Sequence, residues 1–140
     1  MNIQILKIAL AEIGFRGITG PKTNKQILKY FSELGIAWVK DDDTAWCSAF
    51  VNWVLMKAKI KGTGLLNARS FLNWGKKTDT PQMGDIVVLW RESIKSWKGH
   101  CGFYICDRGD TIMILGGNQD NSVSIKAYDK KMVLAYLTEK

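Results

Sequence analysis

Apolar residues recur every three to four positions in the first half of the chain, a spacing that places them on one face of a helix. The pattern predicts four helices, over residues 3–13, 24–34, 45–61 and 68–74. Gly14, Gly35 and Gly62 follow the first three, and glycine is a common helix terminator.

Strand spacing replaces helical spacing after Gly84. Residues 86–90 form a continuous apolar run, typical of a strand that is covered on both faces. Four more strands are predicted, over residues 101–106, 111–115, 122–126 and 132–137. The turn signal at 107–110 makes a hairpin of the first two. Because helices come first and strands follow, we expect an α+β fold with a largely antiparallel sheet.

Length and composition indicate one globular domain. The chain has 140 residues, of which 46% are hydrophobic and 24% charged, and residues 1–140 are expected to share one core. Residues 1–40 form its N-terminal helical part and residues 41–140 the part that bears the motifs. No apolar run is long enough for a membrane span, and no signal peptide is recognisable, so we expect synthesis in the cytoplasm.

The chain is basic, with 20 Lys and Arg against 13 Asp and Glu, a net charge of +7. Such a charge either lies on an ordinary solvated surface or attracts the protein to a polyanion, such as the phosphate-rich envelope of bacteria. The basic residues are scattered and no nucleic-acid motif accompanies them, so nucleic acid is not an expected partner. The three cysteines include no CxxC pair, and neither a metal nor another cofactor is expected.

One cysteine stands where chemistry is expected. Cys47 follows a polar run and opens an apolar helical pattern, so its thiol lies in the first turn of a helix, where free N–H groups favour a thiolate. The only histidine, His100, lies on a predicted strand between Gly99 and Gly102. A thiolate that faces a histidine is the nucleophile and base of papain-like enzymes. A packing role for a cysteine on a helix is the alternative.

Asn118 is the candidate for a third residue that orients the histidine. If Arg108 and Gly109 form a two-residue turn, His100 faces Gly117, and Asn118 points to the wrong side of the sheet. A three-residue loop, or a bulge at the preceding glycine pair, makes Asn118 the neighbour of His100. The alternative is that Asn118 only caps a turn.

Four segments resemble the NlpC/P60 and CHAP superfamily of papain-like cysteine peptidoglycan hydrolases: residues 44–51, 81–87, 99–104 and 116–119. The resemblance implies a papain-like catalytic domain whose nucleophile, on a helix start, packs against a C-terminal antiparallel sheet. It implies that Cys47 is the nucleophile, His100 the general base and Asn118 the orienting residue. The chain departs from the family at Trp46, where many members have aspartate, and at Cys101, where valine is usual.

Five further residues are candidates for substrate binding. Aromatic residues near the motifs can line a groove for a glycan or a peptide, and one of the aspartates before Cys47 can bind a substrate amine. The candidates are Trp46, Trp97, Tyr104, Gln119 and Asp43. Trp97 lies in a polar loop and is expected to be exposed. A contact of Gln119 with His100 would instead make Gln119 the orienting residue.

The implied function is cleavage of an amide bond of the cell-wall stem peptide, by an endopeptidase or an N-acetylmuramoyl-L-alanine amidase. A phage lysin or a secreted antibacterial effector fits this function, as a monomer that acts in the periplasm or cell wall after release or injection. Bacterial peptidoglycan is then the partner, with a holin-type or immunity protein beside it. The alternatives are a papain-like acyltransferase or transpeptidase, and a non-catalytic domain that binds cell wall or a partner protein.

Overall fold

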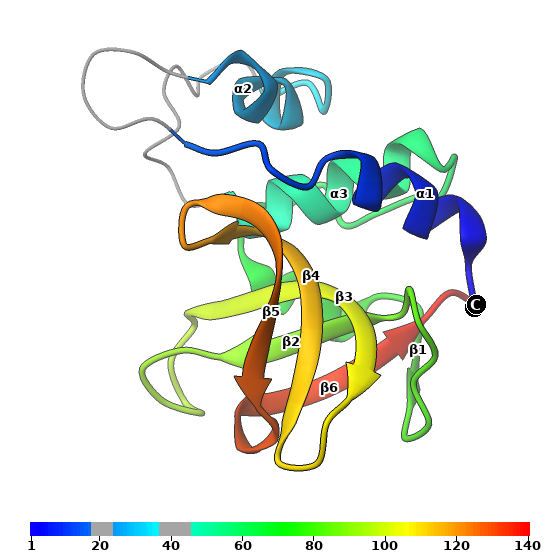
Figure 1. The fold of residues 1–140 in the computed structure, drawn as a ribbon, viewed down its shortest axis with the longest axis vertical. Helices are drawn as coiled ribbons and strands as arrows, with labels where there is room; N and C mark the ends of the chain where they lie inside the picture. The colour runs from blue at the N-terminus through cyan, green and yellow to red at the C-terminus, as the bar shows by residue number, and fades with distance from the viewer. Residues whose placement is uncertain (18–23, 37–45) are drawn as a thin grey trace.

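The computed structural model describes residues 1–17, 24–36 and 46–140. Helices lead the chain and strands follow, as Figure 1 shows. The helices are α1 (Ile3–Ala11), α2 (Lys25–Ser32), α3 (Cys47–Lys57) and the short 3-10 helices η1 (Ala68–Asn73) and η2 (Lys130–Met132). The strands are β1 (Lys76–Thr78), β2 (Ile86–Trp90), β3 (Gly99–Asp107), β4 (Thr111–Gln119), β5 (Ser122–Asp129) and β6 (Val133–Thr138).

Local sequence explains where the helices begin. The side chains of Asn2 and Asn24 accept backbone hydrogen bonds at the starts of α1 and α2, as N-cap residues do. The helix α3 begins at Cys47 without a side-chain cap. It ends at Lys57, earlier than predicted, and Lys59 follows in the left-handed region at φ 62°. The predicted fourth helix is a 3-10 helix.

The six strands form one antiparallel sheet in the order β1-β6-β2-β3-β4-β5. This confirms the predicted α+β class. The short strand β1 was not predicted, because its three residues carry no apolar pattern. The sheet curves strongly, and α1 and α3 lie on one side of it in Figure 1.

The strand β2 is covered on both faces, as its apolar run predicted. Ile86 and Val88 belong to the large core under the helices, and Val87 and Leu89 belong to a smaller apolar cluster on the other face. The sheet therefore has a helix face and a far face, each with its own apolar cluster. The side chains of β3 also divide between the two faces, and Cys101 belongs to the core under the helices.

Two irregularities in strand pairing decide which residue reaches His100. The pairing of β3 with β4 shifts between Tyr104 and Cys106. On the side of the shift that is farther from the hairpin turn, Phe103 pairs with Leu115. Continued in that register, His100 would face Asn118. The expected three-residue loop is absent, because Arg108 N–H donates to Thr111 O across a two-residue turn, and the shift in β3 produces the register instead. The pairing of β4 with β5 then shifts as well.

This second shift lies between Gly116 and Gln119 and gives β4 one extra residue. Asn118 lies in the bulge with φ 57°. An extra residue reverses the alternation of side chains, so Gln119 takes the side expected for Asn118. In agreement, a Cβ atom added at Gly116 would lie 2.6 Å from Gln119 Oε1.

Candidate active site

Cys47 is the first residue of α3 and only 5% exposed. Its side chain lies in the core cluster and also reaches the wall of a cavity of about 430 Å³. A buried thiolate is costly unless hydrogen-bond donors surround it. The start of an α-helix supplies free backbone N–H groups and a partial positive charge, so the fold places the sulfur where a negative charge is best tolerated.

A second sulfur supports the first. The thiol of Cys101 donates a hydrogen bond to the Cys47 sulfur, and this is the largest cause that holds the pKa of Cys47 well below its ordinary value. Burial opposes that shift, while a hydrogen bond and the charge of His100 add to it. Burial, and then the Cys47 thiolate, raise the pKa of Cys101, so Cys101 stays protonated as the donor.

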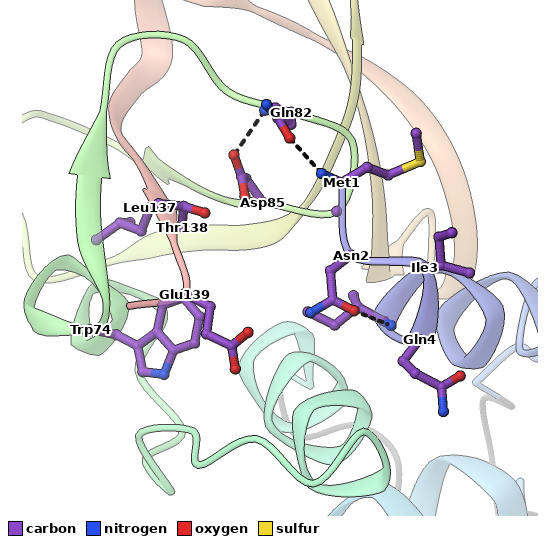
Figure 2. A pocket seen from close by; sticks show the side chains of 12 residues that line it. Met1, Asn2, Ile3, Gln4, Trp74, Gln82, Asp85, Leu137, Thr138 and Glu139 are labelled. Carbon is purple, nitrogen blue, oxygen red and sulfur yellow. Dashed lines mark hydrogen bonds between the residues drawn. The ribbon is translucent and has the colours of Figure 1, made fainter.

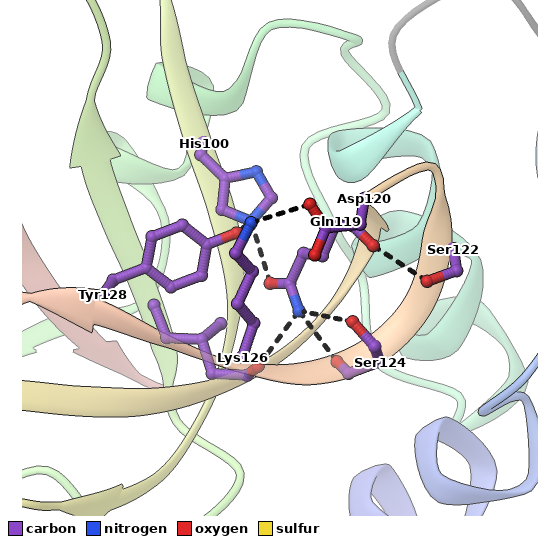
Figure 3. Close-up of polar contacts among 8 residues, drawn as sticks. His100, Gln119, Asp120, Ser122, Ser124, Lys126 and Tyr128 are labelled. Atoms are coloured by element: carbon purple, nitrogen blue, oxygen red, sulfur yellow. Dashed lines mark hydrogen bonds and ion pairs between the residues drawn. The ribbon is translucent and has the colours of Figure 1, made fainter.

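The imidazole of His100 is held through its Nε2 atom. Its Nε2 lies 3.0 Å from Oε1 of Gln119, as Figure 3 shows. The amide nitrogen of Gln119 donates to the carbonyl oxygens of Ile114, at 3.2 Å, and Ser124, at 2.8 Å. Carbonyl oxygens only accept, so the amide cannot be turned round, and its own oxygen must face the ring.

This contact determines the tautomer of His100. An amide oxygen accepts but does not donate, so Nε2 of His100 carries the proton that Gln119 binds. In the neutral ring the lone pair is then on Nδ1, the nitrogen that Figure 3 shows on the side away from Gln119. His100 also lowers the pKa of Cys47, and with Nε2 bound to Gln119, Nδ1 is the nitrogen that can exchange a proton with the thiol.

Tyr128 is a residue of the site that was not predicted from the sequence. Its ring stacks on the imidazole of His100 with centroids 5.2 Å apart, and its hydroxyl lies 3.2 Å from Nε2. Burial, and then the charge of Cys47, raise the pKa of Tyr128, so the hydroxyl stays protonated. The alternation along β5 was a usable signal, because Ser124, Lys126 and Tyr128 all occupy alternate positions of that strand.

The predicted contact of Asn118 with His100 is wrong. Asn118 lines a cavity of about 210 Å³ that His100 also lines, but Gln119 makes the hydrogen bond. The bulge in β4 is the physical reason. Gln119, which was expected to bind substrate, is 1% exposed, and its side-chain oxygen contacts His100.

The cavity beside Cys47 has walls built from two loops. Asn52 of α3 donates to Leu65 O at 3.1 Å and accepts from Gly64 N at 3.0 Å, which fixes the loop before Ala68. The guanidinium of Arg69 holds the second loop through three carbonyl oxygens, those of Ser93, Ile94 and Lys98.

Trp97, on that second loop, lines the cavity and is 71% exposed. Its exposure agrees with the prediction. The indole ring is therefore available to a molecule that enters beside Cys47.

Two other aromatic candidates do not line this cavity. Trp46 is fully buried and stacks on Tyr30 with centroids 5.9 Å apart, because it packs in the core under the helices. Tyr104 lies in the cluster of the far face, edge-on to Tyr136 at 5.7 Å. The expectation that they form a substrate groove is wrong. Asp43 lies outside the described residues.

Another cavity, of about 440 Å³, lies at the opposite end of the sheet and is shown in Figure 2. Its walls come from the start of α1, from Trp74 and Asp85, and from the end of β6. None of its lining residues is a cysteine or histidine. Of these two cavities, only the one beside Cys47 has a thiol in its wall.

Two kinds of feature are absent from the described ranges 1–17, 24–36 and 46–140. They contain no group of three or more side chains that could hold a metal ion. No helix in them has the length and apolar character needed to cross a membrane.

Comparison with known proteins identifies the family. The CHAP domain family matches residues 39–118, more than half of the chain. The chain belongs to the CHAP domain family. The match includes Cys47 and His100 and stops one residue before Gln119. No curated protein matches this CHAP chain by sequence.

Solved structures of the NlpC/P60 family share the fold. A lipoprotein-like NLP/P60 protein of Staphylococcus aureus is 18% identical over 98% of this chain and 41% of its own, with a TM-score of 0.54. The peptidoglycan hydrolase RipB of Mycobacterium tuberculosis is 14% identical over 98% of this chain and 63% of its own, with a TM-score of 0.60. This CHAP chain thus spans less than two thirds of either protein.

RipD of Mycobacterium tuberculosis has the same fold without catalysis. It is a non-catalytic NlpC/p60 domain protein adapted to peptidoglycan binding, 16% identical over 98% of this chain and 95% of its own, with a TM-score of 0.55. The papain-like α+β fold of this CHAP chain is therefore shown, and the fold alone does not separate a hydrolase from a binding protein.

Proposed function

We propose that the chain is a cysteine hydrolase that cleaves an amide bond of the peptidoglycan stem peptide. The observation that carries the proposal is the hydrogen bond from His100 Nε2 to Gln119, which leaves Nδ1 to serve Cys47. A wall-binding protein needs no tautomer control of a histidine beside a buried thiol. The CHAP family supports peptidoglycan as the substrate class.

In the first half of the proposed reaction, the Cys47 thiolate attacks the amide carbonyl and a C–S bond forms. Backbone N–H groups at the start of α3 stabilise the oxyanion. The protonated His100 gives its Nδ1 proton to the leaving nitrogen as the C–N bond breaks, and the thioester remains. Gln119 keeps Nε2 protonated, and the stacked ring of Tyr128 helps to hold the imidazole in place.

In the second half, His100 accepts a proton at Nδ1 from water, which attacks the thioester carbonyl. The C–S bond then breaks, and the products are the free carboxylic acid and the Cys47 thiolate. An added amine in place of water would give a new amide, which is the transpeptidase alternative. The two alternatives therefore differ in the product and not in the residues.

Mass spectrometry of the products from purified peptidoglycan tests the proposal. We expect new free carboxylate and amine ends from the wild type and none from Cys47→Ala, and the product masses identify the bond that is cleaved. The same digestion with added glycine amide distinguishes a transpeptidase, which would form a glycine amide adduct. Binding of both proteins to the wall without any cleavage would favour the non-catalytic role that RipD has.

The biological setting is a further part of this proposal. We propose that the enzyme acts from the periplasm or cell wall, as a phage lysin or an antibacterial effector, because peptidoglycan lies outside the cytoplasm. Expression in a bacterium with and without an added signal peptide tests this. Lysis is expected only with the signal peptide and only when Cys47 is intact. A holin-type or immunity protein is the partner expected in that setting.

A further inference from the structure

Arg91 borders both cavities of the candidate site, the one beside Cys47 and the one that His100 lines. It directly follows β2, and its backbone N–H donates to Lys98 O at 3.3 Å while its carbonyl accepts from Ser93 N at 2.8 Å. These bonds fix its Cα atom at the base of a loop. Its exposed side chain lines the cavity beside Cys47 and also the cavity that His100 lines.

The other cations at these cavities are already neutralised. Lys98 forms an ion pair with Glu92 at 2.8 Å, and Lys126 forms one with Asp120 at 3.0 Å. Among the residues that the structure describes, Arg91 has no such ion pair. Arg91 is therefore a positive charge without an ion pair at a residue that lines both cavities.

The charge of Arg91 reaches the residues that hold the imidazole. Burial and the charge of Cys47 raise the pKa of Tyr128, and Arg91 acts in the opposite direction. Arg91 lines one cavity together with Cys47 and another together with His100 and Tyr128, so it borders the place of the bond that Cys47 and His100 would act on. A substrate group bound there is thus next to the scissile amide.

An unpaired guanidinium selects a planar anion, because its N–H groups match the two oxygens of a carboxylate. Stem peptides of peptidoglycan carry free carboxylates beside their amide bonds. We propose that Arg91 binds a substrate carboxylate adjacent to the scissile amide, so that the enzyme prefers stem peptides in which this carboxylate is free over those in which it is amidated. This inference rests on the proposed function and adds the charge of the substrate to it.

Two synthetic stem peptides that differ only in this group, a free carboxylate or a carboxamide, test the proposal. We expect the wild type to cleave the acid with a kcat/KM about tenfold or more above that for the amide. Arg91→Gln should reduce this preference to about twofold or less, because cleavage of the acid slows much more than cleavage of the amide. Arg91→Lys should keep part of the preference, because it keeps the charge without the planar fork.

Lys95→Gln is the matched control, since it removes the same charge from the same loop at a residue that lines neither cavity. It should keep the full preference. An Arg91→Gln enzyme that still prefers the acid as the wild type does would overturn the proposal. So would an equal loss of preference in Lys95→Gln, because the effect would then come from net charge.

Binding of the two peptides to Cys47→Ala separates this proposal from the proposed function. Calorimetry should show tighter binding of the acid, and the double variant Cys47→Ala/Arg91→Gln should bind both peptides equally. If the wild type cleaves neither peptide and the acid still binds better through Arg91, only the hydrolase assignment fails. Equal binding of acid and amide to Cys47→Ala would contradict the carboxylate site itself.

Discussion

Cys101 and His100 are neighbours on β3, but they belong to opposite faces of the sheet and to two differently built parts of the candidate site. On the helix face, Cys101 packs in the apolar core and donates from a buried thiol to the Cys47 sulfur. On the far face, His100 is held by the polar side chains of Gln119 and Tyr128. The proposed nucleophile is thus supported by the core and the helix start, and the proposed base by side chains that form no part of that core.

This difference has a consequence for substitution. Support from the core depends on burial and on one weak S–H donor, so a substitution of Cys101 removes at most one weak polar contact. Support for the base depends on a buried amide whose four hydrogen-bonding contacts must all be satisfied together. We therefore expect substitutions near the base to cost more activity than substitutions behind the nucleophile.

The largest effect is expected at Cys47 and His100 themselves. Cys47→Ala and His100→Ala should each lower the turnover of peptidoglycan by about a thousandfold or more, and the double variant should be little worse than either one. Cys47→Ser should be nearly as inactive, because an alcohol does not ionise beside this histidine. Dye release from labelled cell wall measures the loss, and circular dichroism checks the fold. Additive losses in the double variant would show that the two residues do not act as one unit.

Gln119→Leu should lower kcat by about tenfold to a hundredfold with little change in KM, because the imidazole loses both its orientation and its tautomer. Asn118→Gly is the control, since glycine accepts the left-handed backbone at this position and removes only the side chain. We expect the control to keep most of its activity. A larger loss in Asn118→Gly than in Gln119→Leu would restore Asn118 as the orienting residue.

Cys101→Val should raise the pKa of Cys47, because the thiolate loses its S–H donor while His100 and Tyr128 still face it. The sign follows from the form that is stabilised: a donor favours the thiolate, so its loss moves thiolate formation to higher pH. The rate of alkylation of Cys47 by iodoacetamide, followed by peptide mapping from about pH 4 to pH 9, measures this.

Cys101→Ser provides the matched comparison, because it keeps a donor at the same place. Its alkylation profile should lie closer to the wild type than to Cys101→Val. The acid limb of the pH profile of kcat/KM should move in the same direction. Profiles that shift equally in both variants would mean that Cys101 acts through packing and not through its hydrogen bond.

Tyr128→Phe should reduce kcat by about fivefold or less, since it removes one hydrogen bond of the ring and keeps the stacking. Comparison with Gln119→Leu tests whether the two residues act on the same atom of His100. Because Tyr128 contacts the same nitrogen as Gln119, the two losses should not add in a double variant. Fully additive losses would argue that Tyr128 acts elsewhere than on His100.

The smallest effect is expected at Trp97, in the wall of the cavity. Trp97→Ala should raise KM roughly threefold through lost contact area and leave the melting temperature unchanged, because the side chain is 71% exposed. Thermal unfolding and initial rates with a soluble muropeptide measure the two quantities. A fall in stability would show instead that Trp97 holds its loop.

Several local features could be predicted from the sequence because they depend on local order. A polar run followed by an apolar helical pattern placed Cys47 at a helix start, and Cys47 is the first residue of α3. The continuous apolar run in β2 predicted a strand with both faces covered, and the two apolar clusters confirm it. The order of helices and strands predicted the α+β class.

The third residue of the site was decided by tertiary structure. Side chains alternate along a strand with a period of two, so every bulge reverses the side on which all later residues point. The sequence indicated that a bulge or a longer loop would put Asn118 next to His100. The chain contains irregularities in both β3 and β4, and together they bring Gln119 there instead. Nothing in the local pattern specifies how many bulges a strand pair contains.

Contacts between distant segments were decided in the same way. Trp46 next to the nucleophile looked like a groove residue, but its large apolar ring is better buried, and the helices provide a place for it against Tyr30. Tyr128 is 28 residues from His100 and stacks on it only because the curved sheet brings β5 over β3. Sequence order determines which elements form and which face of each is apolar. Which polar side chains meet across the sheet depends on register and curvature, which only the packed structure has.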